Sequence, residues 1–148
     1  MLSKKTKYAI KALLALAEHQ PGDPVRIADL AREEQIPAKF LETILLGLKN
    51  QGVLLSRKGK GGGYCLARDP STIYLGQIVR MFDGPLAPVP CASQTAYAPC
   101  ADCRDEVSCG VHLAMKEVRD ATAKVLDGTS LAMLRRKVQQ AGLAALPK

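Results

Sequence analysis

Four cysteines and a histidine lie within one short segment of the chain: Cys91, Cys100, Cys103, Cys109 and His112. Thiolates and imidazole are ligands for zinc and for iron–sulfur clusters. Structural zinc sites usually contain two short Cys-x-x-Cys-like pairs, and this segment contains one such pair. The wider, irregular spacing favours an iron–sulfur cluster surrounded by several thiolates, of two-iron or four-iron type. A zinc site and reduced thiols without a ligand role are the alternatives.

Whether these thiols form disulfides depends on the cellular compartment of the protein. The longest apolar run near the start covers residues 12–17, far short of the roughly 20 that a membrane-spanning helix needs. Lys4, Lys5, Lys7 and Lys11 interrupt the N-terminus, so we expect no secretory signal. We therefore expect a cytoplasmic protein without a membrane partner, whose cysteines stay reduced instead of forming a disulfide framework.

Two further reactive residues stand apart from this cluster. Cys65 lies in an apolar strand pattern, between Tyr64 and Leu66, which predicts a small buried side chain. His19 is isolated at the end of a predicted helix, where a solvated cap is expected. No carboxylate–histidine pair forms a recognisable site, so we do not expect an enzyme.

Composition and charge indicate a folded, basic protein whose excess of positive charge lies in its first half. The chain has 148 residues, 47% of them hydrophobic, which suits one domain, or a small domain with an appendage. The net charge is +7. Residues 1–68 hold 12 Lys and Arg against 6 Asp and Glu, whereas residues 69–148 hold 9 against 8. A polyanion would therefore bind the first half.

The first half also has the element order of a DNA-binding fold. Apolar spacing predicts helices over residues 4–19 and 27–35 and a third helix with Pro37 in its first turn, ending near Gln51 before Gly52. Residues 53–67 form two short strand patterns around a glycine-rich basic tip. This order predicts a mainly α protein with a small β-hairpin wing, a winged helix-turn-helix domain.

Two sets of polar residues could contact DNA. The polar face of the third helix would enter the major groove and the hairpin tip would reach phosphates or the minor groove. The glycines of the tip resemble a phosphate loop, but no Walker Lys-Ser/Thr follows them, which excludes nucleotide binding by that motif. The predicted contacts are Lys39, Glu42, Thr43 and Lys49 on the helix and Arg57, Lys58 and Lys60 on the wing.

The remaining sequence predicts an arm attached to this domain. A helix is expected over residues 75–82, a proline-rich connection over 84–90, and a long helix from about His112 to Leu126. A two-fold partner would bury the apolar stripe of the long helix. Thr129 is expected to cap a last helix over 130–140. The stripe consists of Val111, Met115, Val118, Thr122 and Val125.

Several segments resemble the Rrf2 family of winged helix-turn-helix regulators, which includes IscR-type and NsrR-type cluster sensors. The similar segments are TKYAIKALLALA (6–17), KFLETILLGLKNQGVLLSRKGKGGGYCLARDP (39–70), DGPLAPVPC (83–91) and the spacing Cys103-x5-Cys109-x2-His112. The resemblance covers nearly the whole chain. It implies a homodimeric transcription regulator that binds a near-palindromic operator, and a cluster held by three cysteines and one further ligand.

The resemblance also implies a ligand set. Cys91, Cys103 and Cys109 match the three primary cluster ligands, and the fourth would be His112 or Cys100. The chain departs from the family pattern in three places. Eleven residues separate Cys91 from Cys103, Lys7 stands where some members have an aspartate ligand, and Lys58 stands where many have a wing arginine.

These observations together predict a DNA-binding transcriptional regulator, most simply a repressor, that senses iron, redox state or nitric oxide. We divide the chain into a winged domain (1–83), a connection with the cysteine loop (84–112) and a dimerisation helix followed by a C-terminal helix (113–148). The alternatives are a regulator of the same fold with zinc or bare thiols, an iron–sulfur carrier and a metalloenzyme.

Overall fold

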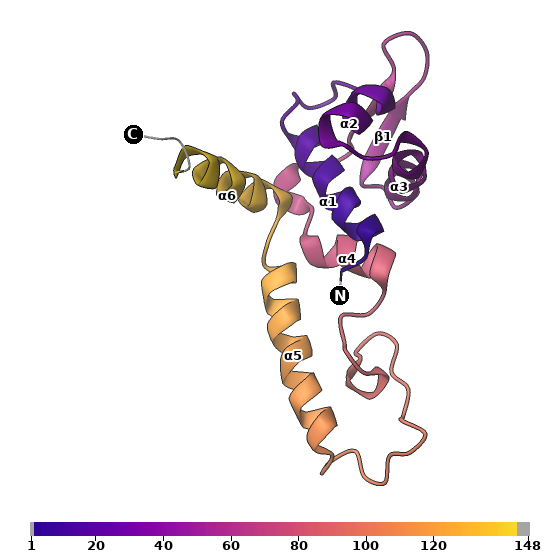
Figure 1. Cartoon of the computed structure of the whole chain (residues 1–148), viewed down its shortest axis with the longest axis vertical. Coiled ribbons are helices and arrows are strands. Elements are labelled where there is room, and N and C mark those ends of the chain that lie inside the picture. The colour runs from indigo at the N-terminus through magenta and orange to yellow at the C-terminus, as the bar shows by residue number, and fades with distance from the viewer. Residues whose placement is uncertain (1, 145–148) are drawn as a thin grey trace.

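Three helices and an antiparallel hairpin come first along the chain, as the sequence predicts. The computed structural model describes residues 2–144, with side chains as far as Leu143. The hairpin is packed beside the helices at one end of the molecule (Figure 1). The elements are α1 (Lys4–Ala17), α2 (Ile27–Glu34), α3 (Ala38–Asn50), β1 (Leu54–Arg57) and β2 (Gly63–Leu66).

Local signals explain the ends of these helices. The side chain of Ser3 caps α1 by accepting a hydrogen bond of 3.1 Å from the Thr6 amide. Gln35 ends α2 in the left-handed region, with φ of 54°. Pro37 lies at the N-cap of α3, one residue before the position predicted for it. Gly52, with φ of 72°, ends α3 as predicted, because glycine has no Cβ and adopts this conformation without a steric penalty.

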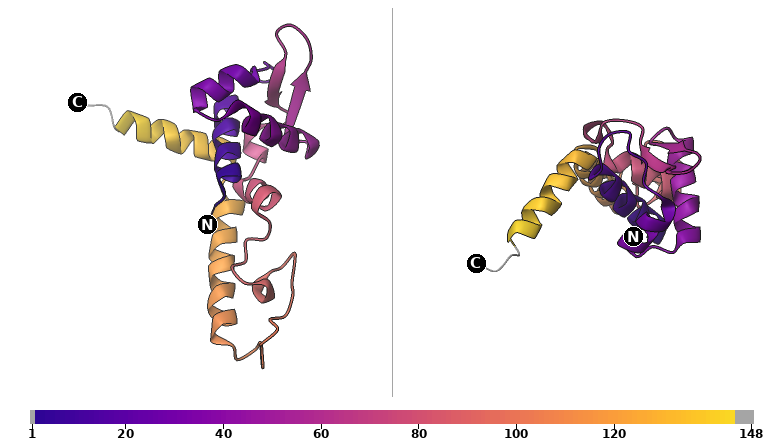
Figure 2. Two further views of the ribbon diagram at one scale, coloured as in Figure 1. Left: turned by 45° about the vertical axis from the view of Figure 1, so that its right-hand side comes forward. Right: turned by 90° about the horizontal axis from the view of Figure 1, so that it is seen from above.

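The hairpin is short and is anchored at its base. Its register pairs Leu54 with Leu66 and Arg57 with Gly63, so the tip consists of residues 58–62. Val25 and Tyr64 exchange two backbone hydrogen bonds of 2.8 and 2.9 Å, which tie β2 to the loop before α2. The wing is therefore fixed at its base while its basic tip projects into solvent (Figure 2).

The hydrophobic core lies between α1, α3, the hairpin and α4 (Leu75–Asp83). The inward face predicted for α3 is confirmed for Leu41, Ile44, Leu45 and Leu48, which are all fully buried, while Phe40 is half-buried. Phe40 packs edge-to-face on Tyr8 of α1, with ring centroids 5.7 Å apart. This packing fixes α3 as a rigid support for its polar outer face.

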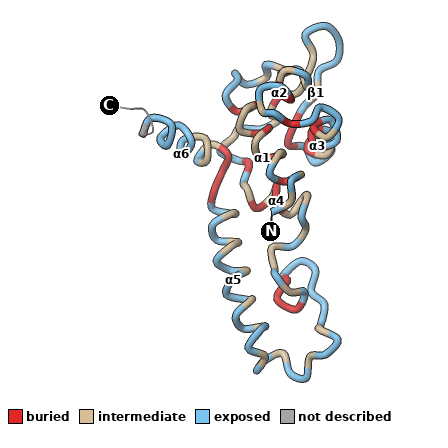
Figure 3. The backbone as a smooth tube through the Cα atoms, viewed as in Figure 1, coloured by how far each residue is buried: buried red, intermediate tan, exposed pale blue. Residues whose placement is uncertain are grey.

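The chain after α4 forms the arm. A short 3-10 helix (Pro70–Thr72) precedes α4, and another (Pro90–Ala92) follows it. The long helix α5 (Gly110–Asp127) begins before His112, which therefore lies in its first turn and not in the loop. Alongside α5 runs the irregular segment 93–109, and most of both is exposed (Figure 3).

The arm is joined to the winged domain where α4 meets the end of α5. Arg80 makes a bidentate ion pair with Asp127, with N–O distances of 2.6 and 2.8 Å. Gly76 permits this approach, because a side-chain carbon built there would lie 1.8 Å from Asp127 Oδ1.

The last helix, α6 (Leu131–Ala144), starts against α1 and then extends away from the winged domain (Figures 1 and 2). The predicted cap is wrong. The Ser130 hydroxyl accepts from the Met133 amide at 3.2 Å, whereas the Thr129 hydroxyl donates to the Val125 carbonyl at 2.7 Å. Within the described residues, no helix is long and apolar enough to cross a membrane.

Candidate functional site

The polar outer face of α3 and the wing tip form one candidate surface. All seven residues predicted to contact DNA are exposed: Lys39, Glu42, Thr43, Lys49, Arg57, Lys58 and Lys60. Among the described residues, none of the five cations in this set has a carboxylate partner. Unpaired surface cations on a helix and an adjacent hairpin are available to neutralise phosphates.

Sequence reasoning missed one residue on this surface. Leu46 lies on α3 between Thr43 and Lys49, and 49% of its surface area is exposed. It follows Glu42 by one helical turn, so it shares the face that carries Glu42 and Thr43. An apolar residue on an otherwise polar helix face is the signal that could have found it, because apolar side chains contact the methyl group of thymine.

The second candidate site is a cavity of about 390 Å³ at the far end of the arm. Its lining includes all five predicted metal ligands: Cys91, Cys100, Cys103, Cys109 and His112. Cys91 is buried and the other three cysteines are half-buried. The cavity therefore gathers the sulfur and imidazole donors of a segment that spans more than twenty residues.

Three pieces of backbone bring these donors together. Cys91 lies in the 3-10 helix Pro90–Ala92, which Arg119 of α5 anchors by donating to the Ala92 carbonyl at 2.5 Å. Cys103 closes a turn by donating its amide to the Cys100 carbonyl at 3.2 Å. Cys109 is the N-cap of α5.

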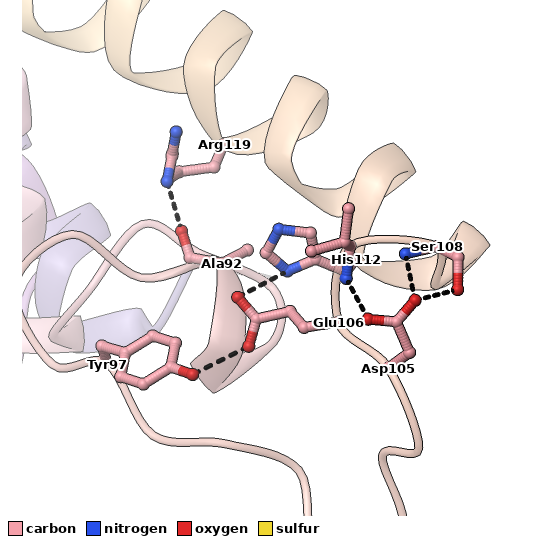
Figure 4. Close-up of polar contacts among 8 residues, drawn as sticks. Ala92, Tyr97, Asp105, Glu106, Ser108, His112 and Arg119 are labelled. Atoms are coloured by element: carbon pink, nitrogen blue, oxygen red, sulfur yellow. Dashed lines mark hydrogen bonds and ion pairs between the residues drawn. The ribbon is translucent and has the colours of Figure 1, made fainter.

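A cluster of polar residues surrounds the His112 side of the cavity (Figure 4). Asp105 accepts hydrogen bonds from the amides of Val107 and Ser108, both at 3.1 Å, and so shapes the turn before α5. Glu106 accepts from the Tyr97 hydroxyl at 2.8 Å, and its other oxygen lies 3.7 Å from His112 Nδ1. Tyr97 and Glu106 were not identified from the sequence, because no motif spacing links them to His112.

Two thiols of the cavity have shifted proton affinities. The pKa of Cys100 is raised, mainly by its hydrogen bond with the Cys91 thiol. The pKa of Cys103 is raised mainly by burial and then by the neighbouring Cys109 and Cys100. Crowded thiols resist forming several thiolates at once, and a bound cation reverses that preference because it stabilises each thiolate.

The donor set suits a thiolate-bound metal or cluster, although its side chains are not yet in ligating positions. Within the described residues, no three His, Cys, Asp or Glu side chains are placed to hold one ion. His112 Nδ1 is buried and has no hydrogen-bond partner among those residues. A buried, unsatisfied imidazole nitrogen beside four free thiols is chemically consistent with a ligand site that closes on binding.

The fold and the exposed basic surface define a winged helix-turn-helix regulator whose arm carries a cysteine-lined cavity. Over residues 2–137 the sequence matches the family described as Rrf2, iron-dependent transcriptional regulator. The chain belongs to the Rrf2 family of transcriptional regulators, as its resemblance to that family indicated. Members of this family are regulators and not enzymes, which confirms that expectation.

Individual relatives agree with this assignment. The chain is 40% identical over 134 residues to an HTH-type transcriptional regulator named Rrf2-like from Rhodobacter capsulatus, covering 88% of this chain and 89% of the relative. It is 29% identical to the regulator IscR of Aliivibrio salmonicida, covering 94% and 80%. The structure of CymR, the global cysteine regulator of B. subtilis, superposes with a TM-score of 0.76 at 27% identity, covering 93% and 97%.

Proposed function

We propose that this protein is a homodimeric DNA-binding regulator whose cysteine cavity holds an iron–sulfur cluster and thereby senses iron supply, redox state or nitric oxide in the cytoplasm. The observation that carries the proposal is the convergence of four cysteines and one histidine on a single cavity. Repression of transcription is the simplest output, because a protein bound at an operator blocks polymerase without further contacts.

Cys91, Cys103 and Cys109 are the proposed primary ligands, and His112 or Cys100 is the fourth. We favour His112, because its buried Nδ1 lacks a hydrogen-bond partner among the described residues. Cys100 lies in the part of the loop whose spacing departs from the family pattern. A bound two-iron or four-iron cluster would supply one-electron chemistry and sensitivity to oxidants at this end of the arm.

DNA binding is assigned to α3 and the wing. Lys39, Glu42 and Thr43 lie near the start of α3, where helix-turn-helix proteins usually contact base edges. Lys49, Arg57, Lys58 and Lys60 would contact phosphates. Their exposure and lack of ion pairs among the described residues support this division.

The exposed side of α5 supports a dimer. Met115 and Thr122 of the predicted stripe are half-buried against their own chain, whereas the valines of the stripe are exposed. Two exposed alanines complete a row with alternating spacings of three and four residues, which is the pattern of a coiled-coil seam. A second copy related by a two-fold axis would bury this row. The row consists of Val111, Ala114, Val118, Ala121 and Val125.

In this proposal the three parts of the chain have separate roles. Residues 1–83 bind DNA, 84–112 supply the connection and the cluster loop, and 113–148 supply the paired helix and the C-terminal helix. The last four residues of the third part lie outside the described residues. Two such subunits would read a near-palindromic operator, because operator symmetry mirrors protein symmetry.

The test is a selection of operator sequences from random duplexes, performed under nitrogen with cluster-loaded protein. We expect a near-palindromic sequence, dimeric binding and a log–log salt slope of roughly −5 to −7, from about −0.9 for each neutralised phosphate. Joint replacement of Arg57, Lys58 and Lys60 by Ala should flatten that slope by about 2–3. Absence of any selected sequence would favour an iron–sulfur carrier, and an unchanged slope would remove the wing from the interface.

One observation favours a second candidate, a regulator of the same fold that works without a cluster. The donors line one cavity, yet no three of them among the described residues are positioned around one ion. A thiol-based sensor would need only free cysteines near one another, and a zinc site would need four of these donors. Metal and sulfide analysis of anaerobically purified protein separates the three cases, because only a cluster contains inorganic sulfide.

A further inference from the structure

A second cavity, of about 530 Å³, lies on the winged domain. Its walls come from the end of α1 and the loop after it, from β2 with the residues that follow, and from the start of α6. None of the lining residues belongs to the DNA-binding set or to the cysteine cavity. The volume lies within the range of ordinary small-molecule sites.

The lining combines apolar walls with cationic groups. Leu16, Leu66 and Pro70 contribute apolar surface from three different elements. Arg68 and Arg135 contribute guanidinium groups. Such a combination is complementary to a molecule with an apolar body and a negatively charged head.

Arg135 has spare capacity for hydrogen bonding. Its Nη1 donates to the Ala17 carbonyl at the end of α1. Its Nε is buried and has no hydrogen-bond acceptor among residues 2–144, and the nearest acid, Glu18, lies 4.0 Å away. Buried donors are normally satisfied, so Arg135 retains a donor that the described residues do not fully engage.

Arg68 also has donors to spare. It donates one hydrogen bond of 3.3 Å to the side-chain oxygen of Gln77, and it has no carboxylate partner in the described part of the chain. Asp69 is the acid in the cavity lining, and its carboxylate accepts from the Ser71 amide at 2.8 Å, where it caps the 3-10 helix. The lining therefore holds two guanidinium groups and one engaged carboxylate, and Glu18 outside the lining offsets part of the charge of Arg135 but not that of Arg68.

We propose that this cavity binds a small organic carboxylate with an apolar body, held by Arg68 and Arg135. A planar carboxylate matches the fork of a guanidinium and can accept two hydrogen bonds at once. This inference goes beyond the proposed function, and it does not depend on a cluster.

The position of the cavity gives such a ligand access to the wing. The lining residue Gly22 lies beside the wing arginine Arg57, since a side-chain carbon built there would be 3.6 Å from its Nη2. The same loop continues to Val25, which is paired with Tyr64 of β2. A ligand that contacts residues 19–22 would therefore act on the loop that leads to the base of the wing, and through it on the affinity for DNA.

The probe is hexanoate, with 1-hexanol and hexylamine as uncharged and cationic counterparts of the same length. Full-length protein labelled with ¹⁵N is titrated with each compound, and amide shifts of residues 16–22, 65–70 and 132–135 are followed. We expect hexanoate to shift these amides in a saturable manner below about 10 mM, and the other two compounds to bind at least ten-fold more weakly.

Arg68→Gln is the decisive variant, because Arg68 does not anchor another element through a carboxylate among the described residues. It should weaken hexanoate binding by about ten-fold or more, the usual loss for a hydrogen bond to a charged group. Ala132→Leu should do the same by narrowing the cavity. The exposed neighbour Arg136→Gln is the matched control and should bind like the parent. Absence of saturable shifts, equal binding of 1-hexanol, or unchanged affinity in Arg68→Gln would overturn the proposal.

Discussion

The winged domain and the arm are stabilised in different ways. In the winged domain, α1 and α3 bury long apolar side chains completely, and residues from five elements share one core. In the arm, no residue of α5 is buried, and the adjacent loop is held mainly by local turns and by Arg119. Exposed apolar surface of this extent on a helix is normally covered by a partner, as we propose for α5.

This difference assigns separate tasks to the two regions. A rigid, self-sufficient core holds α3 and the wing in fixed positions, as a DNA-binding surface requires. An arm completed by a second subunit and by a cluster, as we propose, would respond to both. In the proposed dimer, a signal at the cysteine cavity would change the pairing of the two subunits while each winged domain keeps its internal structure.

The largest effect should come from a charge placed in the exposed row of α5. Val118→Glu would bury an unpaired charge in the proposed dimer, at a cost of about 3–5 kcal/mol for each copy, so self-association should fall more than 100-fold. Thermal unfolding of the winged domain should be unchanged. Sedimentation velocity and calorimetry measure the two quantities.

Leu113→Glu is the control for this variant. Leu113 is 51% exposed and lies five residues, about 140° around the helix, from Val118. The variant Leu113→Glu should leave self-association nearly intact. Equal dimerisation of parent and Val118→Glu would mean that the row does not face a second copy.

A pair of matched truncations compares the two regions directly. Leu45→Ala in the core of α3 should lower the free energy of unfolding by about 2–5 kcal/mol, because Leu45 is fully buried. Leu113→Ala in α5 should cost less than about 0.5 kcal/mol, as for other exposed positions. Urea denaturation of both variants gives the comparison. Similar losses of unfolding free energy in the two variants would show that α5 is packed into the core of the winged domain.

Base selection should depend on the outer face of α3. Glu42→Ala should relax preference at one base pair in each half-site by about 1–3 kcal/mol, if its carboxylate accepts from a cytosine amine. The neighbouring helix provides a control, because Glu33→Ala removes an exposed acid outside the predicted contact face. Competition binding against a panel of single-base operator variants measures the effect. An identical base preference in Glu42→Ala and the parent would mean that Glu42 contacts no base and is only a solvated side chain.

The smallest effect should come from the ion pair between the two regions. The Arg80 guanidinium lowers the pKa of Asp127 through their bidentate hydrogen bonds. Both side chains are about one-third to one-half exposed, so we expect only about 0.5–1 kcal/mol. Because the folded-state pKa is depressed, this stabilisation is present above the unfolded value of about 3.9 and is lost as pH falls through the folded value.

Unfolding of the parent and Asp127→Asn at a series of pH values tests that sign. The difference in stability between the two proteins should be constant near neutral pH and should shrink at acidic pH. A difference that grows as the pH falls would contradict the assignment.

The features that depend on short-range periodicity could be predicted from the sequence. The buried face of α3 follows from helical spacing, and the wing follows from two strand patterns around glycines. Helix ends were less predictable: Thr129 and Ser130 are adjacent hydroxyls, and only the path of the chain decides which one caps α6. The start of α3 was also predicted one residue too early, because Pro37 lies at the N-cap and not in the first turn.

The candidate site was predictable in its residues but not in its geometry. The types and spacing of Cys91, Cys103 and Cys109 indicated ligands, yet their convergence depends on irregular backbone and on Arg119, for which no periodic signal exists. The contact of Glu106 with His112 was equally invisible. Met115 and Thr122 of the predicted stripe on α5 are half-buried against their own chain, because spacing alone does not reveal which face that chain covers.

The central claim is that the cysteine cavity holds an iron–sulfur cluster, and the visible absorption spectrum of protein purified under nitrogen tests it most directly. We expect a coloured protein whose bands disappear in Cys91→Ala, Cys103→Ala and Cys109→Ala and persist in Cys65→Ala, since Cys65 is buried in the wing. Of Cys100→Ala and His112→Ala, one should shift the spectrum and the other should leave it nearly intact. A parent that stays colourless after anaerobic reconstitution with iron and sulfide, or five cavity variants that all keep the parent spectrum, would contradict the claim.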